Sequence, residues 1–155
     1  MKHTYRNTSK IDGLGFFAAE FIKKGDIISK FQGKIEFKIN KNKRDALSHP
    51  DWVGIKNNHW MDPEKPNKFI NHSCNPNTGI KNKVTLVTLK NIKEGEEITI
   101  DYSITEGDMR WEMKCNCGEK KCRKIIYSVQ YLPRNIFDKY IPNIPTYFQK
   151  VYNKK

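Results

Sequence analysis

One stretch decides how the rest of this chain is interpreted: Asn67-Lys68-Phe69-Ile70-Asn71-His72-Ser73-Cys74-Asn75-Pro76-Asn77. An apolar pair leads into a run of Asn, His, Ser and Cys, whose side chains form hydrogen bonds or bind metal. Asn75-Pro76-Asn77 is typical of a turn, so we expect the polar run at a strand end or in a loop. Taken alone, the stretch fits a functional site and an ordinary Asn-rich loop equally well.

The composition is that of one folded domain. The chain has 155 residues, of which 37% are hydrophobic and 12% aromatic, and this is enough for a buried core. No apolar run reaches the length of a membrane span, and the first residues lack the apolar segment of a signal peptide. We therefore expect a soluble protein located inside the cell, with no membrane partner.

The chain is strongly basic, with a net charge of +12 and only five Arg among its 29 basic residues. This excess of Lys favours a diffuse positive field over bidentate phosphate recognition. Such a field could steer the protein toward nucleic acid or toward a partner bound to nucleic acid. Lys, Asn and Ile are abundant together, however, so an A/T-rich coding bias explains the charge equally well.

Short apolar runs separated by turns predict a mostly β architecture of small sheets, because no alternation of strand and helix is visible. Beyond Leu132, apolar residues recur at helical spacing on one face, and Pro142 and Pro145 predict two short helices instead of one. The residues predicted on that face are Ile136, Phe137, Tyr140, Ile141, Ile144, Tyr147, Phe148 and Val151. Strands are expected at 27–31, 51–55, 59–62, 84–89 and 98–102, with an edge strand or arm in 1–12, a small helix or loop in 34–50, and an irregular segment after Tyr102.

The glycine turn Gly13-Leu14-Gly15 precedes an apolar run. Two glycines at this spacing let the backbone turn sharply and approach a ligand closely. The third glycine of the dinucleotide-binding fingerprint is absent, and no strand–helix unit surrounds the pair. A cofactor loop and a plain turn both remain open.

The four cysteines form a pattern typical of a metal site. Cys115, Cys117 and Cys122 lie within eight residues, and Cys74 precedes them by 40 intervening residues. Structural zinc takes four tetrahedral ligands, so a four-thiolate site must include Cys74. Clustered cysteines in an intracellular chain favour metal over disulfides, and the metal would order the tail. A disulfide pair and free thiols remain the alternatives.

In their order along the chain, these motifs resemble those of SET-domain protein lysine methyltransferases. Gly13–Ala18 resembles the N-terminal Gly-x-Gly segment of that family, and Phe31-Gln32-Gly33 resembles its Tyr-x-Gly step. Lys68–Asn77 is close to its Arg-Phe-Ile-Asn-His-Ser-Cys-x-Pro-Asn signature, and Glu96–Tyr102 resembles its Glu-Glu-Leu-Thr-x-Asp-Tyr strand. The cysteine cluster with Arg123 resembles the post-SET zinc segment. The compact layout is similar to that of stand-alone members, bacterial ones included.

The resemblance implies the SET (β-clip) fold, with several small sheets and a pseudoknot in which the C-terminal motif threads under a loop. On this basis residues 1–110 form the SET domain, 111–126 the post-SET zinc segment and 127–155 a C-terminal helical extension. The implied activity is transfer of methyl groups from S-adenosyl-L-methionine (SAM) to the ε-amine of a protein lysine.

The resemblance also assigns roles to residues. Tyr102 would be the catalytic residue, and Ile125 or Ile126 could cover the adenine of the cofactor. SAM would be held by Asp12, Gly13, Leu14, Gly15, Asn71 and His72, and structural Zn²⁺ by Cys74, Cys115, Cys117 and Cys122.

Methyl transfer needs a neutral amine, and deprotonating a free lysine at pH 7 costs roughly 4.6 kcal/mol. A dry channel and the sulphonium charge both lower that pKa, so no strong base is required. Three residues differ from the family pattern, namely Phe31, Trp52 and Lys68. Ile100 stands where the family often has Phe or Tyr, which favours addition of more than one methyl.

Two other functions remain open at this point. One is a catalytically inactive SET module that binds nucleic acid or chromatin-like complexes, and the other is a metal-binding structural domain without a ligand. For the enzyme, the positive charge favours a histone-like, ribosomal or host chromatin protein as substrate. The expected location is the cytoplasm of a bacterium, or the nucleus for a eukaryotic protein or a secreted effector.

Overall fold

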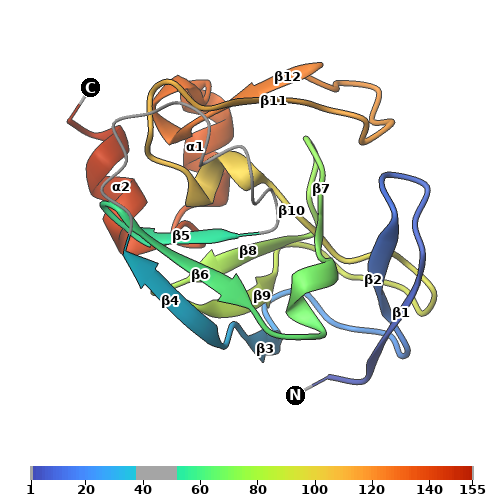
Figure 1. Ribbon diagram of the computed structural model, residues 1–155. Coiled ribbons are helices and arrows are strands. Elements are labelled where there is room, and N and C mark those ends of the chain that lie inside the picture. Colours follow the sequence, from blue (N-terminus) through green and yellow to red (C-terminus); the bar gives the residue numbers. More distant parts are fainter. Residues whose placement is uncertain (1, 38–51, 155) are drawn as a thin grey trace.

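The computed structural model describes residues 2–37 and 52–154, whose strands form five small sheets (Figure 1). This confirms the mostly β architecture. One three-stranded antiparallel sheet has the strand order β3 (Ile27–Lys30), β9 (Thr85–Thr88), β8 (Thr78–Lys81). The other three-stranded antiparallel sheet has the order β4 (Gly33–Phe37), β6 (His59–Pro63), β5 (Val53–Lys56). The two-stranded sheets are antiparallel β1 (Thr4–Thr8) with β2 (Leu14–Ala18), antiparallel β11 (Glu112–Lys114) with β12 (Ile125–Tyr127), and parallel β7 (Asn71–His72) with β10 (Thr99–Ile100).

The parallel pair β7–β10 joins the polar stretch to the segment that carries Tyr102, and Figure 1 shows the two strands side by side. The Asn77 side chain fastens them further, because its Oδ1 accepts from Thr99 N at 2.9 Å and its Nδ2 donates to Glu97 O at 2.7 Å. Asn77 is buried. The polar stretch is therefore an integral part of the fold.

Two predicted elements need correction, the helix or loop in 34–50 and the strand at 98–102. The expected helix or loop in 34–50 begins as a strand, because residues 33–37 pair with β6 along their whole length; residues 38–51 lie outside the described part. The strand expected at 98–102 ends at Ile100. The Asp101 carboxylate accepts from Ser103 N at 3.1 Å and so starts the 3-10 helix η2 (Tyr102–Thr105), because an N-terminal Asp cap satisfies a helix donor.

The segment after Tyr102 is also more regular than expected. It contains β11, β12 and a second short 3-10 helix, η3 (Val129–Tyr131). The β11–β12 hairpin pairs Glu112 with Tyr127 and Met113 with Ile126. This register puts Met113 on the same face as the fully buried Ile126.

The two predicted C-terminal helices are confirmed as α1 (Arg134–Tyr140) and α2 (Thr146–Tyr152), each preceded by a proline. Their apolar face joins the main core, where Phe137 stacks on Tyr152 with ring centroids 3.6 Å apart. Ile141, predicted on that face, is 40% exposed instead. Among the residues described, no helix has both the length and the apolar character needed to cross a membrane.

Candidate functional site

A cavity of about 500 Å³ lies where the glycine turn, the polar stretch, Tyr102 and the β11 region meet. The three predicted site motifs thus border one space, although up to 90 residues separate them in sequence. Of the six residues predicted to hold SAM, Gly15 alone does not line this cavity. The other five, which are Asp12, Gly13, Leu14, Asn71 and His72, line it together with the predicted catalytic residue Tyr102.

The cavity also has walls that the sequence did not predict. Lys68 lines it and donates to Asp62 at 2.8 Å, and Met113, Lys114 and Asn116 form the wall on the side of the cysteine cluster. Neither Ile125 nor Ile126 lines it. The apolar residue at this wall is Met113, which could be found only from the register of the β11–β12 hairpin.

Asn71 holds the glycine turn in place. Its Nδ2 donates to Asp12 O at 3.1 Å, to Leu14 O at 3.2 Å and to Glu97 Oε1 at 2.8 Å. The amide nitrogen is therefore engaged by the protein itself. The Oδ1 atom receives no hydrogen bond from the described residues and can therefore accept one.

Glu97 completes this clamp from the other side of the turn. Its carboxylate accepts from Ser9 Oγ at 2.8 and 2.9 Å as well as from Asn71. A Cβ on Gly15 would collide with the Glu97 carboxylate and would lie 2.9 Å from the Phe17 ring. Gly15 is thus required by close packing, and the site depends on Glu97, to which the sequence analysis gave no role of its own in the site.

We therefore expect Gly15→Ala to destabilise the fold by about 2 kcal/mol, because the methyl group must displace the Glu97 carboxylate. Urea unfolding followed by tryptophan fluorescence measures the change. The matched control is Gly107→Ala, whose Cβ would lie at an ordinary 3.4 Å from Phe148. Equal unfolding free energies for the two variants would show that Glu97 moves aside freely.

Tyr102 is fixed by two hydrogen bonds at the cavity wall. Its hydroxyl donates to Ile70 O at 2.8 Å, and its backbone N–H donates to His72 Nδ1 at 3.1 Å. Burial, opposed by the Asp101 charge and assisted by Arg123, lowers the pKa of His72 to about 4. His72 is therefore neutral near pH 7, and because Nδ1 accepts, its proton lies on Nε2.

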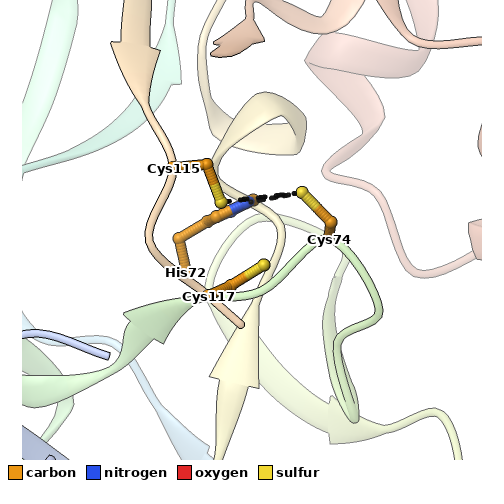
Figure 2. Close-up of side chains that lie close together, drawn as sticks. All are labelled: His72, Cys74, Cys115 and Cys117. Atoms are coloured by element: carbon orange, nitrogen blue, oxygen red, sulfur yellow. Dashed lines mark hydrogen bonds between the residues drawn. The ribbon is translucent and has the colours of Figure 1, made fainter. Parts of the chain in front are cut away.

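The sulphurs of Cys74, Cys115 and Cys117 gather beside the cavity, whereas the predicted ligand Cys122 lies outside this group, and none of the four cysteines forms a disulfide. Figure 2 shows Cys74, Cys115 and Cys117 around His72, and one ligand atom from each of these four residues lies within 4.8 Å of the others. Cys115 contacts the thiols of Cys74, Cys117 and Cys122. His72 Nε2 lies 3.3 Å from Cys74 Sγ. Sequence reasoning found the cysteines but did not place His72 among them.

The electrostatics of this cluster suit a cation. Burial raises the pKa of Cys74 and of Cys115, so a positive charge is needed to hold both as thiolates. Arg123 supplies part of it, since its N and Nε each donate to Cys74 Sγ at 3.4 Å. The Arg123 Nη2 atom also donates to Asp101 Oδ1 at 2.6 Å. This arginine connects the cysteine cluster to the residue just before Tyr102.

This chain is similar in sequence to known proteins. Human histone-lysine N-methyltransferase 2D is 30% identical over 137 residues, which cover 79% of this chain and 2% of that protein. The H3 lysine-9 specific histone-lysine N-methyltransferase KMT1 of Fusarium mangiferae is 37% identical over 81 residues, covering 40% of this chain and 24% of that protein. The chain thus spans a small part of these relatives.

A solved structure shows the same fold. KRYPTONITE in complex with DNA, an H3(1–15) peptide and SAH superposes with a TM-score of 0.63 at 22% identity, covering 82% of this chain and 30% of that one. The SET domain family matches residues 13–103, which include the glycine turn, the polar stretch and Tyr102. More than half of the chain lies in that match, and the chain belongs to the SET-domain family.

Proposed function

We propose that this chain is a SAM-dependent protein-lysine methyltransferase. The observation that carries the proposal is the single cavity bordered by Asp12–Leu14, Asn71, His72 and Tyr102. When bound there, SAM supplies an electrophilic methyl group. The names of the relatives, which are histone-lysine methyltransferases, support the same activity.

The hydrogen bonds around Asn71 indicate how the protein would bind the cofactor. Since its Nδ2 is engaged by Asp12 O, Leu14 O and Glu97, its Oδ1 would accept from the cofactor ammonium. The backbone of Asp12, Gly13 and Leu14 would hold the methionine portion, and the His72 backbone the adenine. Met113 would cover the apolar part of the ligand.

Tyr102 would orient the lysine amine. Its hydroxyl already has a fixed direction, because it donates to Ile70 O and its backbone is tied to His72. Holding the nucleophile in line with the methyl group lowers the barrier by removing rotational freedom. Asp12 is the only carboxylic acid among the described residues lining the cavity. This agrees with a mechanism in which desolvation, and no strong base, yields the neutral amine.

The cysteine cluster would hold structural Zn²⁺ through Cys74, Cys115, Cys117 and Cys122. Two thiolates bound to zinc at about 2.3 Å lie about 3.8 Å apart in tetrahedral geometry, and the Sγ atoms of Cys74 and Cys115 are separated by 3.7 Å. His72 is the alternative fourth ligand by distance. Its Nδ1 accepts from Tyr102 N, so Nε2 carries the proton and would donate to the Cys74 thiolate instead of binding the metal.

The proposal extends to the class of protein that would be methylated. We propose a histone-like, ribosomal or host chromatin protein, since the relatives are named for histone lysines and the KRYPTONITE structure holds an H3 peptide. The net charge of +12 suits approach to a complex that contains nucleic acid. Location in the compartment of such a complex, cytoplasm or nucleus, follows from the same proposal.

Two measurements test the proposed function. Isothermal calorimetry with SAM should show one binding site. Methyl-labelled SAM, incubated with the protein and either core histones, ribosomes or a lysate of the source cells, should label a lysine that mass spectrometry can locate. Absence of SAM binding at high micromolar concentration would overturn the enzyme. Binding of SAM without label in any fraction would favour the inactive module.

A further inference from the structure

Asp101 is the centre of a buried polar network directly behind the catalytic segment. Its side chain is fully buried, and Oδ1 accepts from Arg123 Nη2 at 2.6 Å and from Ser103 N at 3.1 Å. A buried carboxylate is tolerated only when its oxygens have donors. Among the described residues, Oδ2 receives one hydrogen bond, from the Tyr140 hydroxyl at 3.3 Å.

Tyr140 does not belong to the SET domain match, which ends at residue 103. It lies at the end of α1 and is buried. Burial and the adjacent Asp101 charge raise the pKa of Tyr140, so the phenol keeps the proton that it donates. The same C-terminal segment is anchored to the core separately, since Ile80 N donates to Asn143 O at 2.9 Å and Thr146 N to Asn82 O at 3.0 Å. The segment that carries Tyr140 is therefore fixed to the rest of the fold by backbone hydrogen bonds that do not involve Asp101.

We propose that Tyr140 is a positioning residue for Tyr102, acting through Asp101. Asp101 starts η2, and η2 begins with Tyr102, so the orientation of this carboxylate sets the direction in which the catalytic side chain leaves the backbone. Arg123 holds one oxygen of Asp101 from the cysteine cluster, and Tyr140 holds the other from the helical extension. With Oδ2 left without a donor, Asp101 would rotate, and the Ser103 and Tyr102 backbone bonds would loosen with it.

The test compares two buried tyrosines of the same segment. Tyr140→Phe removes the donor to Asp101, and Tyr152→Phe removes a hydroxyl that donates to Leu132 O at 3.1 Å, far from the catalytic segment in sequence. For Tyr140→Phe we expect about a tenfold lower kcat with the KM for SAM changed less than twofold, since tenfold corresponds to a modest misplacement. For Tyr152→Phe we expect kcat within twofold of the wild type.

A second readout does not depend on catalysis. Hydrogen exchange of the Tyr102 and Ser103 amides should become about tenfold faster in Tyr140→Phe and should stay unchanged in Tyr152→Phe. Tyr140→4-aminophenylalanine keeps an N–H donor at the same place and should restore both kcat and exchange protection to within threefold. This rescue also shows whether the phenylalanine variant failed only through misfolding.

The inference rests on the proposed function, and its failure can be told apart from failure of that function. A wild-type protein without methyl transfer would overturn the proposed function, while the exchange rates would still decide the role of Tyr140. Equal effects of Tyr140→Phe and Tyr152→Phe on both readouts would overturn the positioning role, as would a lack of rescue by 4-aminophenylalanine.

Discussion

Tyr102→Phe is expected to lower kcat at least 100-fold while leaving the affinity for SAM within about threefold. The hydroxyl is the part of this side chain that can contact a lysine amine, whereas its ring and backbone bonds remain in the variant. Tyr102 N still donates to His72 Nδ1, and the ring still packs 5.4 Å from the His72 ring. The cavity wall therefore keeps its shape, and SAM should still bind.

Single-turnover methyl transfer and SAM calorimetry measure the two quantities separately. Tyr127→Phe is the matched control, since Tyr127 lies exposed on β12 and does not line the cavity. It should retain full activity. If Tyr102→Phe kept its activity within threefold of the wild type, the hydroxyl would have no part in the chemistry, and its bond to Ile70 O would be structural.

The residues that could be predicted from the sequence are those whose identity is tied to a local pattern. Asn71, His72 and Cys74 fall in one short stretch, and Asp12–Gly15 in another, so each group stays together however the chain folds. Their meeting in one cavity depends on the parallel β7–β10 pair. Only the resemblance to a known family could anticipate that pairing, because the two strands are 26 residues apart and have only two residues each.

The residues that were missed depend on tertiary register. Glu97 follows Glu96 in a charged run, and nothing local distinguishes the two. In the fold, Glu96 accepts from Lys93 N at an exposed turn, whereas Glu97 reaches Asn71 and Ser9. Tyr140 was expected simply on the apolar face of a helix. Its hydroxyl contact to Asp101 could not be predicted, because the two residues are 39 positions apart and the four elements η2, β11, β12 and η3 lie between them.

At the end of the strand before Tyr102, strand propensity and a local side-chain hydrogen bond favour different backbone conformations, and sequence patterns do not show which one prevails. Ile98-Thr99-Ile100 has high strand propensity, which suggested a strand continuing to Tyr102. The side chain of Asp101 captures Ser103 N instead and turns the chain into η2. A local side-chain bond to the backbone thus overrides propensity, and Tyr102 stands on a short helix beside the cavity instead of on a sheet.

Removal of the proposed zinc is expected to have the second large effect, on the wall of the cavity formed by β11. Cys115 and Cys117 follow directly after Met113 and Lys114, which line the cavity. Loss of the metal that these cysteines would bind should therefore make that wall of the cavity mobile. We expect a chelator to lower the Tm by more than 10 °C and to weaken SAM binding at least tenfold. Differential scanning calorimetry and SAM titration before and after restoring zinc measure both effects.

Two single variants then decide which fourth residue binds the metal. Cys122→Ser should lose zinc and reproduce the chelator effects, because a hydroxyl does not replace a thiolate at such a site. His72→Gln should retain one zinc per chain, because His72 Nε2 is a donor to Cys74 Sγ and not a ligand. Cobalt substitution gives a spectroscopic readout, in which the thiolate charge-transfer absorption falls in Cys122→Ser and persists in His72→Gln. The reverse result would assign the fourth position to His72, as the 4.8 Å grouping allows, and would require Nε2 to be deprotonated and Nδ1 to lose its bond from Tyr102.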